Sequence, residues 1–145
     1  MSSRHILCAA FLLLVPAIRP TQQTNPAAEK PPLLHSKAYR FEDLMPNPGG
    51  NFKMYPIFDG ITTRGERLEM HESELRPGET PNPVHAHHNE EIIAIVAGTL
   101  DVTIGETTTR MGPGSAGYAE SDDKIGIKLV GSVPAKYLIF SVGDR

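Results

Sequence analysis

The chain has no tryptophan, and aromatic residues make up only 6% of its 145 residues. Its formal net charge is −3, and no stretch is rich in lysine and arginine. A protein that neutralises nucleic-acid phosphates needs clustered basic side chains, so we expect no nucleic-acid partner. Long runs of helix-forming sequence are also missing, whereas glycine and proline each occur 13 times. Turn-rich sequences of this kind are typical of all-β proteins and argue against a helical bundle.

Cysteine occurs once, at Cys8, inside an apolar stretch over residues 6–18 that follows a short start containing Arg4. This stretch is well short of the about 20 apolar residues that a membrane-spanning helix needs. The order of charged start, apolar middle and polar continuation predicts a signal peptide over residues 1–18. We therefore expect an exported protein, periplasmic or secreted, with no stable membrane insertion after cleavage. An uncleaved anchor and a first strand of the fold are the alternatives.

Cleavage would remove Cys8 and leave a mature chain without cysteine, which would exclude disulfides, thiol catalysis and Cys-based zinc sites. Residues 19–32 (RPTQQTNPAAEKPP) are polar and proline-rich, and they predict a flexible linker. The folded domain is expected over residues 33–145. Its turn signals separate short β-branched or aromatic segments, as in a sandwich or barrel. The clearest predicted strands are 92–96, 99–104, 107–111 and 135–142, with a hairpin turn at Gly105-Glu106.

Three of the six histidines fall within four residues, in the segment 83–91 (PVHAHHNEE). In an extended strand His85 and His87 point to the same side, and after a turn at Asn89 the side chain of Glu91 can face back toward them. Two imidazoles and one carboxylate form the 2-His-1-carboxylate set that binds non-haem iron and similar divalent metals. His88 has the opposite parity and is expected to point away. A histidine-rich surface turn without a ligand is the alternative, because an isolated H-x-H arises readily by chance.

The frame around these residues, Gly78 … His85-x-His87-x3-Glu91-x6-Gly98, resembles the first motif of the cupin superfamily, with the first interval one residue longer than usual. The resemblance covers about residues 68–142 and is closest to the small single-domain cupins. It implies an antiparallel β-barrel or jelly roll. It also implies one divalent metal ion per chain (Fe, Mn, Ni or Zn), bound by His85, His87 and Glu91. Pairing of two chains into a homodimer is a further implication.

The second cupin motif supplies a histidine and, later, an asparagine. The register set by Gly114 and Gly126 places Ile125 and Leu129 at those two positions. Neither side chain can donate to a metal, so the second motif is degenerate and the four-ligand site of the family is incomplete. Three ligands with open positions still suffice for catalytic iron or zinc.

His71 is the nearest candidate to replace the missing ligand. Alternation over residues 68–75 places it on one strand face with Glu69, Ser73 and Leu75. It is therefore a possible additional ligand or pocket residue, although its acidic neighbours slightly favour a solvated strand position. Three other residues are of interest: Asp123 could approach the mouth of the barrel, Glu90 is expected to be an exposed charge, and Tyr118 is expected to pack within the barrel.

These observations predict an exported small cupin-like protein that binds a divalent metal in its barrel and acts on a small organic molecule. No catalytic residue is identified. The resemblance implies dioxygenases, isomerases, decarboxylases and aminohydrolases equally, so whether the chain is an enzyme stays open. The alternative is a non-catalytic cupin that has lost its metal and binds a small ligand with the same residues. A storage or structural barrel is disfavoured, because unpaired polar groups at a cavity are costly.

Overall fold

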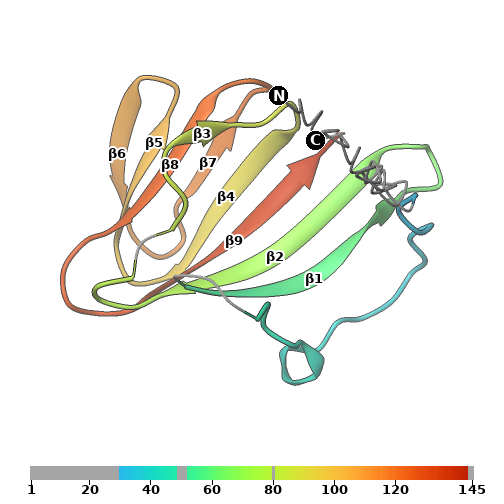
Figure 1. Cartoon of the computed structure of the whole chain (residues 1–145), viewed down its shortest axis with the longest axis horizontal. Helices are drawn as coiled ribbons and strands as arrows, with labels where there is room; N and C mark the ends of the chain where they lie inside the picture. Colours follow the sequence, from blue (N-terminus) through green and yellow to red (C-terminus); the bar gives the residue numbers. More distant parts are fainter. Residues whose placement is uncertain (1–29, 49–51, 80, 144–145) are drawn as a thin grey trace, which may run out of the picture.

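Two antiparallel sheets packed against each other make up the fold (Figure 1), in a computed structural model that describes residues 30–48, 52–79 and 81–143. All pairings between the named strands are antiparallel. Within the described residues the helical structure is a single 3-10 turn, η1 (Phe41–Asp43), and no helix is long and apolar enough to cross a membrane. The all-β jelly-roll architecture is as the sequence predicted.

The larger sheet has five strands in the order β1-β2-β9-β4-β7, and the smaller sheet has four in the order β3-β8-β5-β6. The strands of the larger sheet are β1 (Lys53–Ile61), β2 (Arg67–Leu75), β9 (Ala135–Val142), β4 (Glu90–Ala97) and β7 (Ala116–Ala119). Those of the smaller sheet are β3 (His85–Ala86), β8 (Lys124–Leu129), β5 (Leu100–Ile104) and β6 (Thr107–Met111). The predicted strands at 92–96, 99–104, 107–111 and 135–142 correspond to β4, β5, β6 and β9.

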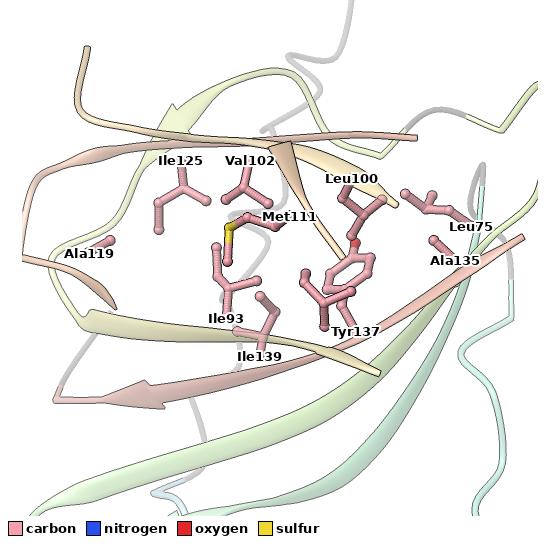
Figure 2. Close-up of a cluster of buried hydrophobic side chains, with 11 residues drawn as sticks. Leu75, Ile93, Leu100, Val102, Met111, Ala119, Ile125, Ala135, Tyr137 and Ile139 are labelled. Atoms are coloured by element: carbon pink, nitrogen blue, oxygen red, sulfur yellow. The ribbon is translucent and has the colours of Figure 1, made fainter. Parts of the chain in front are cut away.

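Alternating side chains on the two inner faces form one hydrophobic core (Figure 2). Along β9 every second residue is buried, which is the period of a strand with one face in the core. Leu75, Ile93 and Leu100 are fully buried and come from three different strands. The remaining members of the core are Ile95, Val102, Met111, Ala119, Ile125, Ala135, Tyr137 and Ile139.

The glycine that closes the first motif is required by close packing. Gly98 follows β4 and has a φ of +75°, a conformation that favours glycine. A Cβ atom at this position would lie 2.6 Å from the Cα atom of Ala135 at the start of β9. No side chain fits there, so Gly98 lets the β4–β5 connection pass directly against β9.

The segment before β1 covers part of the outer face of the larger sheet. Tyr39 lies 5.6 Å from Phe58 and Phe41 lies 5.1 Å from Tyr55, measured between ring centroids. At the beginning of this segment the carbonyl of Pro32 accepts a hydrogen bond of 2.8 Å from the N–H of Ile61. The predicted signal peptide (residues 1–18) and most of the predicted linker lie outside the described residues.

The outer face of β4 and β7 is left exposed. Tyr118 lies opposite Ile92 in the β4–β7 pairing, and 52% of the Tyr118 surface is accessible to solvent. The expectation that Tyr118 packs within the barrel is wrong. Its neighbour Gly117 takes the inward position instead, where a Cβ atom would lie 2.8 Å from the side chain of Ile104. The parity of β7 therefore directs the tyrosine outward.

Candidate metal and ligand site

A cavity of about 250 Å³ lies between the inner faces of the two sheets. At about 30 Å³ per water molecule, it has room for about eight waters or for one small organic molecule. Its lining combines titratable, hydroxyl and apolar side chains from both sheets and from the loop before β3. The lining residues are Phe52, Met54, Glu69, His71, Ser73, Pro81, Asn82, His85, His87, Glu91, Ile125, Gly126, Ile127, Tyr137, Ile139 and Ser141.

The cavity therefore brings together all four residues that the sequence singled out as ligands. His85 and His87 approach it from β3 and the residue after it, Glu91 from β4, and His71 from β2. The two imidazole rings of His85 and His87 are stacked edge to face, with their centroids 4.5 Å apart. The expected convergence of these two side chains is what the structure shows.

His85 is oriented by the loop that precedes it. Its Nδ1 lies 2.6 Å from the carbonyl oxygen of Pro83. A carbonyl oxygen only accepts hydrogen bonds, so Nδ1 is the donor in this contact, and the tautomer that it selects has the lone pair on Nε2. A backbone carbonyl bound to one ring nitrogen is the usual arrangement for a histidine that ligates a metal through the other.

Glu91 is buried and held by neighbouring polar groups. Its Oε1 accepts long hydrogen bonds from Asn89 Nδ2 at 3.3 Å and from Ser141 Oγ at 3.4 Å. The same oxygen lies 3.8 Å from Nε2 of His87. A buried carboxylate is costly unless such partners compensate for lost hydration, and here the partners also fix its direction.

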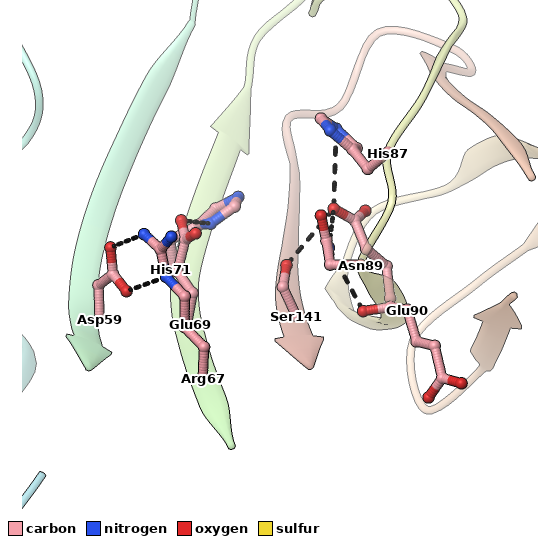
Figure 3. A network of polar contacts seen from close by, with 9 residues as sticks. Asp59, Arg67, Glu69, His71, His87, Asn89, Glu90 and Ser141 are labelled. Carbon is pink, nitrogen blue, oxygen red and sulfur yellow. Dashed lines mark hydrogen bonds and ion pairs between the residues drawn. The ribbon is translucent and has the colours of Figure 1, made fainter. Parts of the chain in front are cut away.

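Glu91 is part of a polar row that crosses three strands. Glu69 on β2 is the register partner of Ser141 on β9, and Ser141 is in turn the partner of Glu91 on β4. Residues directly opposite each other in antiparallel strands point to the same face, so two carboxylates flank one hydroxyl on the same wall of the cavity. Figure 3 shows Glu69 and Ser141 on their adjoining strands.

His71 lies on the same wall, two residues after Glu69 on β2. Only 17% of its side chain is exposed, so the solvated position favoured by its acidic neighbours is wrong. Burial lowers the pKa of His71, while the negative charge of Glu91 acts in the opposite direction. Its Nδ1 is buried without a hydrogen bond, and the carboxylate oxygen Oε1 of Glu69 lies 3.5 Å away. A neutral imidazole with an unsatisfied buried nitrogen can coordinate a metal ion or form a hydrogen bond with a molecule bound in the cavity.

The second-motif positions behave differently from each other. Ile125 lines the cavity and lies directly opposite His85 in the β3–β8 pairing. Leu129 does not line it and packs against the hydrophobic core. Asp123 does not line the cavity either, and its carboxylate lies beside the turn at Gly105. An apolar side chain thus occupies the place of the missing histidine.

Outside the cavity, a clamp formed by His88 and the β7–β8 turn fixes the backbone next to His87. His88 Nδ1 lies 2.6 Å from Asp122 Oδ1, and its side chain is 78% exposed, as its parity predicted. The hydroxyl of Ser121 donates to the His88 carbonyl at 2.6 Å, and the N–H of Asp122 donates to the His87 carbonyl at 2.7 Å. Asp122 has a φ of +67°, which is rare outside glycine. The clamp holds this strained turn against the loop that carries the predicted ligand.

Tyr137 contributes a hydroxyl to the lining from β9. Burial raises its pKa to about 12, with Ser73 acting in the opposite direction and the charge of Glu91 adding to the rise. The phenol is therefore protonated at neutral pH and can donate a hydrogen bond to a bound molecule.

The donor types of the cavity fit a divalent metal. Neutral imidazoles and an oriented carboxylate are the ligands of iron, manganese, nickel and zinc sites. As they stand, however, the described residues include no group of three or more histidine, cysteine, aspartate or glutamate side chains close enough to hold an ion. Two ligands bound at about 2.1 Å in a tetrahedral site are about 3.4 Å apart. The 3.8 Å between His87 and Glu91 is close to that separation. To complete a site with three or four ligands, the side chains of His85 and His71 would have to rotate toward His87 and Glu91.

Sequence reasoning missed two features of the site. Glu69 was expected only to share a strand face with His71, and its place in the cavity lining was not predicted. Tyr137 and Ser141 were predicted only to lie in a strand, and their place in the same lining was not predicted either. Alternation along 135–142 does place Tyr137, Ile139 and Ser141 on one face, so the parity of β9 was the available signal. What it could not indicate was that β9 lies between β2 and β4.

Comparison with known proteins identifies the fold. The family model described as "Cupin domain" matches residues 71–141. An RmlC-like cupin from Shewanella frigidimarina has a TM-score of 0.63 and 16% identity, over 76% of this chain and 94% of that one. A predicted oxalate decarboxylase from Thermotoga maritima has a TM-score of 0.63 and 14% identity, over 74% and 100%.

A third similar structure is the polyketide cyclase RemF from Streptomyces resistomycificus, with a TM-score of 0.60 and 18% identity, over 77% of this chain and 82% of that one. At these identities the likeness concerns the fold, and the two different activities named among these structures do not select one for this chain. No curated protein matches the sequence. The family match, the two-sheet jelly roll and the convergence of the first-motif residues on one cavity agree, and the chain belongs to the cupin superfamily as a small single-domain cupin.

Proposed function

We propose that this chain binds one divalent metal ion with His85, His87 and Glu91, and that it acts on a small organic molecule in the same cavity. The observation that carries the proposal is the placement of all three side chains, together with His71, on one cavity of about 250 Å³. His71 is the candidate for a fourth ligand, because its imidazole is buried, its pKa is lowered by burial and its Nδ1 lacks a hydrogen bond.

A bound divalent ion would supply Lewis acidity, polarising an oxygen of the bound molecule. The chain's own residues orient and shield that molecule. Asn89 and Ser141 hold the carboxylate of Glu91 in place, and Pro83 holds the ring of His85. The protonated hydroxyl of Tyr137 can donate to the ligand from the β9 wall, and isoleucine side chains exclude water from the smaller-sheet side.

A metal-free small-ligand-binding cupin is the second candidate, and Ile125 is the observation that favours it. This apolar side chain faces His85 where the family motif carries a histidine, so one ligand is replaced by a group that cannot coordinate. In that case the imidazoles and Glu91 serve as hydrogen-bonding groups.

Metal analysis of the purified protein separates the two candidates. After reconstitution with Fe, Mn, Ni or Zn, we expect about one ion per chain by elemental mass spectrometry in the wild type, and loss of that ion in His85→Ala and His87→Ala. His35→Ala is the matched control, because His35 is exposed and does not line the cavity. Absence of metal from the reconstituted wild type would favour the metal-free binding protein.

We also propose export through residues 1–18 and pairing of two copies. The first rests on the sequence pattern alone. The second is supported by Ile92, Val96 and Tyr118, exposed apolar side chains that share the outer face of β4 and β7. Secretion assays and light scattering test these two proposals separately.

A further inference from the structure

A row of side chains crosses the inner face of the larger sheet, and on β2 it lies between His71 and the fully buried Leu75. The row follows the register pairs of β1 with β2, of β2 with β9 and of β9 with β4. Its members are Met54, Ser73, Tyr137 and Ile95. Ser73 and Tyr137 both line the cavity. The row is therefore apolar at its two ends and carries two hydroxyls in the middle.

These two hydroxyls are buried. Ser73 is fully buried, and its Oγ makes no hydrogen bond. Tyr137 is 3% exposed, and its ring reaches from the larger sheet toward the smaller one (Figure 2). Burial raises the pKa of Tyr137 to about 12, and Ser73 acts on that pKa in the opposite direction, as a donor placed near the phenol oxygen does.

A bound molecule can stabilise this arrangement by supplying an acceptor. The phenol of Tyr137 keeps its proton at neutral pH, and a buried donor without an acceptor costs free energy. An acceptor oxygen of a molecule in the cavity would take that proton in a hydrogen bond. Ser73 could then donate to the phenol oxygen, which would leave the proton of Tyr137 directed toward the bound molecule.

The surroundings favour a carbonyl oxygen as this acceptor. A carbonyl oxygen accepts a hydrogen bond and brings no proton of its own. A hydroxyl would bring a proton for which the flanking Met54 and Ile95 offer no strong acceptor. A carboxylate would lose its hydration and gain only neutral hydroxyls in return.

We propose that Tyr137 binds a carbonyl oxygen of the small molecule in this cavity, and that Ser73 is the positioning residue that directs the phenol proton toward it. This inference rests on the proposed function only in placing a small molecule in this cavity, and it names the class of that molecule as an uncharged carbonyl compound. Consecutive hydrogen bonds polarise one another, so donation from Ser73 to Tyr137 strengthens the bond from Tyr137 to the carbonyl.

The test uses pairs of uncharged molecules of the same shape. Acetophenone is paired with α-methylstyrene, and cyclohexanone with methylenecyclohexane, so that a methylene group replaces the oxygen in each pair. Ligand-observed NMR at pH 7.5 measures the affinity ratio of ketone to hydrocarbon, with the protein both metal-loaded and treated with chelator. We expect Tyr137→Phe to lower this ratio about fivefold in both forms, because the variant loses one hydrogen bond.

Two further substitutions and their controls locate the effect. Ser73→Ala should lower the ratio about twofold, because the phenol keeps its proton but loses the group that directs it. Tyr39→Phe makes the same chemical change as Tyr137→Phe at an exposed residue that does not line the cavity. Ser132→Ala is the corresponding control for Ser73, since Ser132 is exposed and also lies outside the lining. Both controls should leave the ratio unchanged.

Infrared spectroscopy of acetophenone labelled with ¹³C at the carbonyl separates a positioning role of Ser73 from a structural one. A hydrogen bond weakens the C=O bond, so the stretch of the bound ketone should lie at a lower frequency in the wild type than in Tyr137→Phe. In Ser73→Ala it should lie between the two. A change in cavity shape alone would weaken binding and leave the stretch at its wild-type position.

An affinity ratio that is equal in the wild type and Tyr137→Phe, or no binding by either ketone, would overturn the inference. A wild-type ratio and stretch in Ser73→Ala would contradict the role of Ser73. Metal content tests the proposed function independently. A protein without metal whose ratio depends on Tyr137 contradicts the metal site alone, whereas one that binds metal but shows no such dependence contradicts the carbonyl subsite alone.

Discussion

Ile125 on β8 lies directly opposite His85 on β3, and both side chains line the same cavity. In the first-motif residues this chain keeps the pattern of its family, whereas across the sheet an aliphatic side chain faces the pair of imidazoles. The aliphatic residue contributes no bond to a cation and leaves the site with a donor fewer. A single substitution at Ile125 should therefore change the affinity for a metal ion.

Ile125→His should strengthen metal binding. The new imidazole would enter the cavity beside His85, since opposite residues of antiparallel strands share a face. We expect an affinity for zinc or manganese that rises by roughly tenfold or more, on the scale by which changes around metal ligands alter affinity. Isothermal titration calorimetry of the chelator-treated protein measures the change. Thr109→His, on the exposed strand β6, is the control and should leave affinity unchanged. Equal affinity of Ile125→His and wild type would contradict a metal site at His85.

Tyr137 should make the protein less stable in alkaline solution. Its folded-state pKa of about 12 lies above the ordinary value of 10, so the folded chain keeps a proton that the unfolded chain releases. The contribution is fully present below pH 10 and is lost as pH rises toward 12. At about 1.4 kcal/mol per pH unit, this amounts to roughly 2–3 kcal/mol of the free energy of unfolding. Urea denaturation at pH 8, 10 and 11.5 measures it. Tyr137→Phe should flatten the decline, and an equally steep decline in that variant would assign it to other groups.

His71 should make the protein less stable in acid solution, at the other end of the pH range from Tyr137. Burial lowers its pKa below the ordinary value of 6.5, so below that pH the unfolded chain takes up a proton that the folded chain resists. The stability contribution is present above pH 6.5 and is lost as pH falls through the lowered folded-state pKa. Thermal unfolding in the presence of chelator, from pH 7.5 to 4.5, should show a shallower loss for His71→Gln than for wild type. A variant with the wild-type slope would show that the imidazole is protonated equally in both states.

Gly98 should not tolerate a side chain. A Cβ atom would lie 2.6 Å from the Cα of Ala135, and the residue has a φ of +75°. Gly98→Ala combines a backbone clash with an unfavourable conformation, so we expect a loss of roughly 3 kcal/mol or more in the free energy of unfolding. Gly112→Ala is the matched control, because nothing lies within 4 Å of a Cβ built there. It should change stability by less than about 1 kcal/mol. Equal stabilities of the two variants would contradict the close approach of β4–β5 to β9.

The sequence could predict features that depend on the alternation of side chains along one extended segment. Alternation predicted that His85 and His87 converge and that His88 points outward, and both hold because side-chain direction in an extended segment follows residue parity. The burial of Leu100 and Val102 agrees with the alternation along the predicted strand 99–104. For Tyr118 the expectation was wrong, because residue type suggested burial while the parity of its strand directs it outward.

Relationships between distant strands could not be predicted in this way. The row formed by Glu69, Ser141 and Glu91 depends on strand order and on register, and neither is encoded in the period of any one strand. The pKa of His71 depends on burial by other strands, so its acidic sequence neighbours were a poor guide to its surroundings. The family resemblance supplied the barrel, but it did not reveal which side chains complete the wall.

The position of β9 has a consequence for the order in which the molecule is assembled. It is the last strand of the described residues, yet it pairs on one side with β2 and on the other with β4. During synthesis the earlier strands have no partner at the centre of the larger sheet until residues 135–142 have been made. Glu69 and Glu91 therefore share one wall only after β9 has been made and has paired with both β2 and β4. Until then, a nascent chain whose histidines have already emerged lacks the strand that joins the two halves of this wall.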